Sequence, residues 1–471
     1  MRLPLFLGFA FILGCGSAVT TSPGEEATVT SGSDAPLPPD LGTRKAGSDW
    51  PSFLGPTGDS VTGEKGILTP WPKEGPPLVW EKKVGTGYSV PSISRGRLFL
   101  FDRIRNRCRL SCWKSETAES TWTYEYTTDY VDKYGYNYGP RCCPVVDGER
   151  VYIYGPEGML HCVRATDGKL VWKVDTAAEF GLVQNFFGVA STPVIEGNLL
   201  LVQVGGSPKG SEDVDFSRLK GNGSGLVAFD KYTGKVKYKA TDELASYAGP
   251  VLATIDKRRW CFLFARGGLV GLDPSDGKVE FRYPWRAKIL ESVNASNPVV
   301  VGDKVFISET YGPGSALLKV KPGGCEEVWT DADKDRGDKS MQCHWNTPIY
   351  VDGYLYGCSG RHEDNAELRC IEFATGKVMW SEPNLTRTSL MLVEGHFVCL
   401  AEDGTLSLLK VNPKKYDLVS SVVLQTREAD GRVRPLLQKP CWAAPILSHG
   451  LLYVRGSDRL VCLELIPHKN K

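Results

Sequence analysis

The residues of this 471-residue chain that are best suited to chemistry recur three positions before a proline or its equivalent. The first set is Tyr88, Arg141, Ala190, Tyr247, Ala295, Trp345 and Trp442, and Asn185, Glu291, Asn294, His344 and Arg387 lie near them in the sequence. Aromatic rings can stack on a planar ligand, and arginine or asparagine can orient its acidic groups. The pattern therefore predicts a site for a planar acid, with these candidate contacts: Arg141, Asn185, Asn294, Trp345, Arg387 and Trp442.

Glu291 and Asn294 also carry side-chain oxygen atoms. Calcium prefers oxygen ligands, so these two residues are the candidate ligands if calcium is bound. Glu291 is also the first candidate for a catalytic proton acceptor. The alternative is a water-filled channel lined by polar residues, and the sequence favours this alternative over a ligand site.

The fourteen cysteines could be reactive, but their spacing favours packing. One recurring position holds only small residues, namely Cys112, Cys162, Ala228, Gly271, Cys370 and Cys462. A free cysteine at such a position behaves as a small hydrophobic residue. Cys142 and Cys143 also match small residues in the other repeats, and in an extended strand their side chains point to opposite faces. The sequence leaves open whether Cys358 and Cys370 form a disulfide across a hairpin.

Other catalytic and metal-binding signatures are missing from the sequence. The acidic run with Asp331 and Asp338 has Arg336 and Gln342 where an EF-hand loop requires Gly and Glu, so a solvated connection is expected. There is no haem-attachment motif, phosphate loop, Gly-x-Ser-x-Gly sequence or paired-histidine zinc motif. The spacing of the six histidines indicates no nucleophile–base pair.

These positions belong to a repeat that begins near residue 77. Each repeat has a strand, a turn and a second strand ending in an aromatic residue, as in the segments from Leu160 to Trp172 and from Leu368 to Trp380. A further pair of strands precedes each hairpin. The eight units begin near residues 88, 139, 188, 247, 292, 344, 386 and 441. Their spacing matches four antiparallel strands per unit, as in the blades of a β-propeller.

The two ends of the repeat region complement each other. The last unit supplies three strands and ends at Leu463, whereas the strand ending at Trp80 lies alone near the start. Pairing these strands would close the ring and remove its exposed edges. We therefore predict an all-β, eight-bladed β-propeller over residues 77–471, with its last blade closed by an N-terminal strand.

The composition and the N-terminal segment exclude some classes of function and indicate where the protein is located. The chain has 56 Lys and Arg against 55 Asp and Glu, and no concentrated basic region, which argues against nucleic-acid binding. The apolar run Leu3–Leu13 follows Arg2 and is too short to span a membrane, so residues 1–14 are a predicted signal peptide. Residues 15–48 are predicted to form a flexible tether, and residues 49–76 are expected to wrap the ring.

The hairpins Ala165–Trp172 and Ala374–Trp380 resemble pyrroloquinoline-quinone (PQQ) repeats. Two families share this repeat: quinoprotein alcohol dehydrogenases, and propeller lipoproteins that assist outer-membrane protein assembly in bacteria. The resemblance implies that the closing tryptophan docks against the next blade. Gly14-Cys15 resembles a bacterial lipobox, which implies acylation of Cys15 and a location on the periplasmic side of an envelope membrane. The vicinal pair Cys142 and Cys143 resembles the adjacent cysteines that form a disulfide over the quinone in some dehydrogenases. The favoured interpretation remains that both side chains pack between strands.

These resemblances imply two functions. The favoured one is a non-catalytic, lipid-anchored binding or scaffold protein that presents its rim and channel mouth to envelope proteins and needs no cofactor. The alternative is a PQQ- and calcium-dependent alcohol or sugar dehydrogenase with its site at the channel mouth and Glu291 as catalytic residue. Such dehydrogenases are generally longer, with extra segments over the active site, and this chain has little spare length.

Overall fold

The computed structural model describes residues 36–183, 186–427 and 430–468. The predicted signal peptide, Cys15, residues 16–35 of the predicted tether, and Asn185 lie outside these ranges. The described chain is almost entirely β-structure. Its helices are α1 (Thr176–Phe180) and the 3-10 turns η1 (Phe216–Arg218), η2 (Arg336–Asp338) and η3 (Glu363–Asn365). No helix in these ranges is both long enough and apolar enough to cross a membrane.

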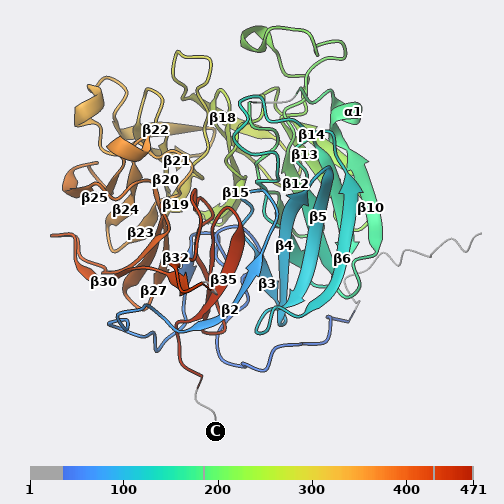
Figure 1. The fold of residues 1–471 in the computed structure, drawn as a ribbon. Coiled ribbons are helices and arrows are strands. Elements are labelled where there is room, and N and C mark those ends of the chain that lie inside the picture. Colours follow the sequence, from blue (N-terminus) through green and yellow to red (C-terminus); the bar gives the residue numbers. More distant parts are fainter. Residues whose placement is uncertain (1–35, 184–185, 428–429, 469–471) are drawn as a thin grey trace, which may run out of the picture. The chain divides into compact units, whose positions relative to one another are not determined.

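The described residues form an eight-bladed β-propeller (Figure 1). Each blade has four antiparallel strands, and the sheet of blade 7 gains a short fifth strand that pairs in parallel. Blade 1 comprises β3 (Ser92–Ser94), β4 (Arg97–Ile104), β5 (Arg107–Lys114) and β6 (Ser120–Thr127). Blade 2 comprises β7 (Val145–Asp147), β8 (Arg150–Tyr154), β9 (Met159–Arg164) and β10 (Leu170–Asp175). Blade 3 comprises β11 (Val194–Glu196), β12 (Leu199–Gln203), β13 (Leu226–Asp230) and β14 (Val236–Ala240). Blade 4 comprises β15 (Val251–Ile255), β16 (Arg258–Ala265), β17 (Gly268–Leu272) and β18 (Val279–Pro284).

The second half of the ring repeats this arrangement. Blade 5 comprises β19 (Val299–Val301), β20 (Lys304–Ser308), β21 (Ser315–Lys321) and β22 (Gly324–Thr330). Blade 6 comprises β23 (Ile349–Val351), β24 (Tyr354–Ser359), β25 (Glu367–Glu372) and β26 (Val378–Pro383). Blade 7 comprises β27 (Thr388–Val393), β28 (His396–Ala401), β29 (Thr405–Lys410) and β30 (Leu418–Val423). A separate hairpin of β31 (Gln425–Arg427) and β32 (Val433–Pro435) follows.

Blade 8 is built from both ends of the propeller. It comprises β33 (Ile446–Ser448), β34 (Leu451–Arg455) and β35 (Arg459–Glu464), with β2 (Leu78–Lys83) as its fourth strand. β2 pairs antiparallel with β35, so that Trp80 lies opposite Cys462. The predicted fold, including closure of the last blade by an N-terminal strand, is therefore confirmed.

The recurring small residue and aromatic residue explain why the blades pack as they do. In each case they lie opposite each other on the third and fourth strands, as in Cys162–Trp172 and Gly271–Phe281. The aromatic ring then reaches the next blade: Trp172 Nε1 donates to Lys231 O at 3.1 Å. A Cβ at Gly271 would overlap the ring of Phe281, so only glycine fits at this position of blade 4. The predicted packing role of this position is thus supported by its geometry.

The segment before β2 crosses one end of the central channel. Trp50 exchanges two backbone hydrogen bonds with Ile93 at 2.7 and 2.9 Å, and Pro51 O accepts from Val146 N at 2.8 Å. β1 (Val61–Thr62) then pairs in parallel with β27. These partners belong to the innermost strands of blades 1, 2 and 7. Residues 50–62 therefore close the channel at the end where these strands finish, and the other end, where the strands start, stays open.

The flanking residues are also attached to the propeller. Residues 63–76 follow blades 7 and 8, where Leu68 N donates to Leu465 O at 2.8 Å and Trp71 N donates to Ser420 Oγ at 2.9 Å. Residues 36–48 were placed in the tether by the sequence. They lie against blades 8 and 1, with Leu41 N 3.0 Å from Arg95 O and an ion pair of 2.6 Å between Arg44 and Glu464.

Candidate functional site

The open end of the channel, which we call the channel mouth, contains a cavity of about 370 Å³. Every blade contributes one residue that precedes its innermost strand: Tyr88, Arg141, Ala190, Tyr247, Ala295, Trp345, Arg387 and Trp442. The innermost strands all start at this end, so their preceding residues converge. Phe53, Leu54 and Ser60 of the channel-closing segment also line the cavity. The cavity therefore lies between the N-terminal segment and the mouth.

Four of the six candidate ligand contacts lie together here: Arg141, Trp345, Arg387 and Trp442. Asn294 does not line the cavity. It is buried, and its Nδ2 donates to Ala265 O at 2.8 Å and to Trp285 O at 3.1 Å. Glu291 is exposed and also lies off the cavity lining. The two candidate calcium ligands thus have no place in this cavity, and Asn185 lies outside the described residues.

Aromatic rings and arginines form one wall of the cavity. The ring centroids of Trp345 and Trp442 are 4.8 Å apart, and those of Tyr88 and Trp442 are 4.6 Å apart. Arg387 Cζ lies 4.7 Å from the Trp345 ring and 5.2 Å from the Trp442 ring. Such cation–π contacts hold the guanidinium and the rings in fixed relative positions.

The three arginines of the lining differ in how their charges are balanced. Arg387 makes two bonds to Glu402, of 2.6 and 2.5 Å, and Arg141 pairs with Asp132 at 2.8 Å. Arg361 Cζ lies 4.4 Å from the Tyr311 ring, and its guanidinium forms no ion pair within residues 36–183, 186–427 and 430–468. No Asp or Glu from these ranges lines the cavity. Arg361 therefore gives the channel mouth an excess positive charge.

Burial fixes the protonation of several lining residues. It lowers the pKa of His344 to about 3, with nearby arginines adding to the effect, and raises the pKa of Tyr311 to about 12. The Tyr311 hydroxyl lies 3.0 Å from His344 Nε2. Burial also raises the pKa of Cys143 to about 12 and that of Tyr247 well above its usual value. At neutral pH these four groups are uncharged, and none of them is poised to exchange a proton.

Sequence reasoning missed Arg361 and Tyr311 as parts of the site. Both lie in connections between the second and third strands of a blade, β24–β25 and β20–β21. The second strand runs antiparallel to the innermost strand, so this connection returns to the mouth. The sequence could have indicated them only by their position just after the second strand of a blade. No residue type recurs at this position from blade to blade.

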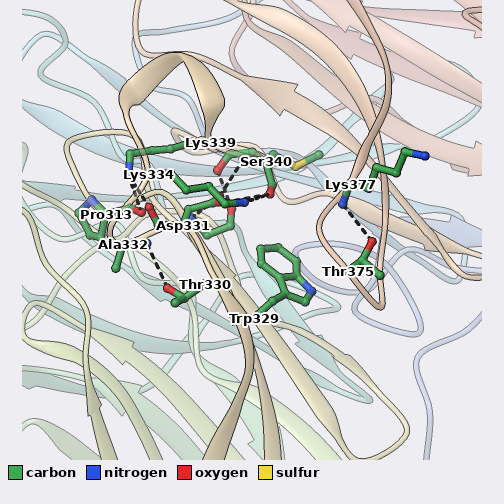
Figure 2. A network of polar contacts seen from close by, with 12 residues as sticks. Pro313, Trp329, Thr330, Asp331, Ala332, Lys334, Lys339, Ser340, Thr375 and Lys377 are labelled. Carbon is green, nitrogen blue, oxygen red and sulfur yellow. Dashed lines mark hydrogen bonds and ion pairs between the residues drawn. The ribbon is translucent and has the colours of Figure 1, made fainter.

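The acidic run after blade 5 is a structural connection, which Figure 2 shows in detail. Asp331 is fully buried and accepts from Ser340 N and Oγ, both at 2.9 Å, and from Lys334 Nζ at 2.8 Å. Lys339 Nζ donates to Asp331 O at 2.6 Å and to Pro313 O at 3.2 Å. The expected solvated connection is wrong for Asp331, because the loop folds around its carboxylate. In the described part of the chain, no three His, Cys, Asp or Glu side chains are grouped to hold a metal ion.

The cysteines are free thiols wherever the structure describes them. Cys142 Sγ lies 3.3 Å from Ser191 O, whereas Cys143 Sγ accepts from Val90 N at 3.3 Å. The two side chains thus face blades on opposite sides, in agreement with an extended strand. Across the blade 6 hairpin, Cys358 faces Leu368 rather than Cys370, so the geometry does not favour the disulfide that the sequence left open.

The chain matches one known protein family in sequence, and several solved structures in fold. The family model for outer membrane protein assembly factor BamB matches residues 134–382, which is more than half of the chain. No curated protein matches the chain in sequence. BamB from Moraxella catarrhalis has a TM-score of 0.55 and 13% identity, covering 84% of this chain and 99% of that one.

Two other solved structures share the fold at low identity. Quinohemoprotein alcohol dehydrogenase from Comamonas testosteroni has a TM-score of 0.60 and 12% identity, covering 90% of this chain and 82% of that one. The computationally designed Ika8 protein has a TM-score of 0.52 and 10% identity, covering 83% of this chain and 100% of that one. Likeness at this level shows the architecture alone. The family match and the eight-bladed fold together show that the chain belongs to the PQQ-repeat propeller family described as outer membrane protein assembly factor BamB.

Proposed function

We propose that the chain is a non-catalytic binding protein of the bacterial cell envelope, with its binding site at the channel mouth. The observation that carries this proposal is the charge of the cavity lining. The half-buried His344, Tyr311 and Tyr247 and the buried Cys143 stay neutral because of their shifted pKa values, and Arg361 supplies a positive charge that no lining carboxylate from the described residues balances. A general acid or base works best with a pKa near the working pH. Membership of a family named for outer-membrane protein assembly supports protein partners in the envelope.

The alternative function is a PQQ- and calcium-dependent dehydrogenase, and the lining residues fit its two cofactors unequally. Arg141, Arg387 and the tilted pair of Trp345 and Trp442 suit a planar polyacid. Calcium needs several oxygen ligands, usually including carboxylates. Glu291 and Asn294 lie off the cavity, and among the residues that the structure describes, the lining contains no carboxylate. The residues therefore do not fit calcium, and we derive no step of quinone chemistry from them.

An oxidation assay tests the proposed function. Full-length protein with PQQ and Ca²⁺ would be assayed for dye-linked oxidation of alcohols and sugars, beside a quinoprotein dehydrogenase as positive control. We expect no turnover above the protein-free background. Turnover that disappears in the double variant Arg141→Ala, Trp442→Ala would overturn the proposal, because it would place the quinone at the channel mouth.

The proposal includes export and a lipid anchor. The predicted signal peptide ends at Gly14-Cys15, and the polar residues that follow would tether the propeller to the membrane. Substitution Cys15→Ser removes the only acylation site in this motif. We expect wild-type protein in the membrane fraction of cells and the C15S variant in the soluble fraction. An unchanged distribution would contradict anchoring through Cys15.

A further inference from the structure

We propose that the channel mouth binds an acidic side chain of a partner polypeptide that lies across the propeller face. Arg361 would bind the carboxylate, and residues 129–140, which are part of the connection between blades 1 and 2, would support the partner's main chain. We call residues 129–140 the tyrosine loop, after Tyr130, Tyr134, Tyr136 and Tyr138. The inference rests on the proposed function, because it names the partner chemistry of the same site.

The donor that a ligand can reach in this part of the cavity is Arg361 rather than the neighbouring indoles. The Nε1 atoms of Trp345 and Trp442 are buried and have no hydrogen-bond partner among the described residues. Both indoles line the cavity, as does Arg361, but their Nε1 atoms are buried beneath its surface. A carboxylate that enters the cavity would therefore be bound by the N–H donors of the Arg361 guanidinium, whose geometry matches its oxygens.

The balance of charge at the mouth favours a negatively charged ligand. Asp132 and Glu402 already neutralise Arg141 and Arg387 through ion pairs of 2.8 and 2.5 Å. These two carboxylates are buried and lie off the cavity lining. Arg361 is left as the cation without a counter-ion in the described lining. A carboxylate that enters the cavity would therefore meet an uncompensated positive charge.

The surface around the cavity is better suited to a polypeptide than to a small molecule. Tyr136 lines the cavity and is 64% exposed, and the neighbouring Tyr134 and Val131 are 45% and 62% exposed. The centroids of Tyr136 and Phe187 are 5.9 Å apart, so apolar surface continues from the cavity onto the tyrosine loop. A ligand confined to the cavity would leave this surface bare. Tyrosine, tryptophan and arginine together are typical of the energetic centres of protein interfaces.

The closed far end of the channel limits how a polypeptide can bind. Residues 50–62 cross the channel, and Phe53 and Leu54 line the cavity from that side. A chain therefore cannot thread through the ring. It can lie across the tyrosine loop and insert one side chain, and the charge of Arg361 selects an acidic one.

Fluorescence anisotropy with full-length protein tests the inference. The probes are labelled peptides with acetylated and amidated ends that carry one Glu between aromatic and aliphatic residues, and matched peptides that carry Gln instead. We expect saturable binding of the Glu peptides that weakens as salt is added. In the Arg361→Gln variant, binding should weaken about ten- to a hundred-fold. The thermal midpoint should fall only slightly, because Arg361 loses its contact with the Tyr311 ring but has no ion pair to lose among the described residues.

Lys235→Gln provides the matched control. Lys235 is exposed in the turn between β13 and β14, at the opposite end of the strands from the mouth, and forms no ion pair in the described structure. This variant loses the same unit of charge and should bind like wild type. Equal binding by Arg361→Gln or equal binding of the Gln peptides would overturn the inference. Quinone-dependent turnover would instead overturn the proposed function, so the two failures can be told apart.

Discussion

The substitution Glu402→Gln should lower stability and at the same time strengthen anion binding. Glu402 holds Arg387 through bonds of 2.6 and 2.5 Å, and the two side chains are 6% and 14% exposed. Removal of one partner from a fully buried ion pair costs roughly 3–5 kcal/mol. Here the guanidinium borders an open cavity and the glutamine carbonyl keeps one acceptor. We therefore expect a loss of about 2–3 kcal/mol in the free energy of unfolding.

Urea denaturation followed by tryptophan fluorescence and circular dichroism would measure this loss as a lower midpoint at unchanged slope. The double variant Arg387→Gln, Glu402→Gln removes both charges and should be more stable than Glu402→Gln alone. Peptide titration would measure the second effect, since an unpaired Arg387 adds positive charge to the mouth. A Glu402→Gln midpoint equal to wild type, or weaker binding of the acidic peptides, would refute the reasoning.

Three further predictions concern packing, pH and the loop after blade 5. Gly271→Val would force a side chain against the ring of Phe281, and this overpacking should lower the free energy of unfolding, measured from the urea midpoint, by about 1–3 kcal/mol. An unchanged midpoint would show that the sheet moves to accommodate the side chain. His344 has a pKa near 3 in the fold against 6.5 in the unfolded chain, so protons favour the unfolded chain as the pH falls. Wild type should therefore lose about 1.4 kcal/mol per pH unit relative to His344→Gln between pH 6.5 and about pH 3, and parallel pH profiles would contradict this pKa. Asp331→Asn leaves donors such as Ser340 N without their charged acceptor, so we expect a loss of about 1–3 kcal/mol and faster proteolysis within residues 331–340, whereas wild-type proteolysis rates would argue against a structural role for this carboxylate.

The sequence was sufficient to predict the ring because its repeat is itself a packing rule. A small residue opposite an aromatic one, as at Cys162 and Trp172, recurs in most blades, and the unpaired strands at the two ends complete one blade. The same repeat placed one residue per blade at the mouth. Repeating geometry therefore carried the prediction from local strands to the position of the cavity.

The repeat could not decide which way individual side chains point. Asn294 was assigned to the mouth because it adjoins Ala295, but successive residues of an extended chain face opposite sides, and its amide instead binds Ala265 O and Trp285 O. Arg361 and the channel-closing residue Phe53 lie in segments without periodicity. Their positions depend on contacts between distant parts of the chain, which no local pattern records.

The calcium dependence of PQQ binding tests the central claim most directly. Full-length protein would be titrated with PQQ in the presence of Ca²⁺ and again in the presence of a chelator, with tryptophan fluorescence as the signal. Because the cavity lining holds no carboxylate among the described residues, we predict that any quenching is the same in both titrations. Binding that tightens with Ca²⁺ and leads to oxidation of an alcohol would contradict the claim that the channel mouth is a binding site without catalysis.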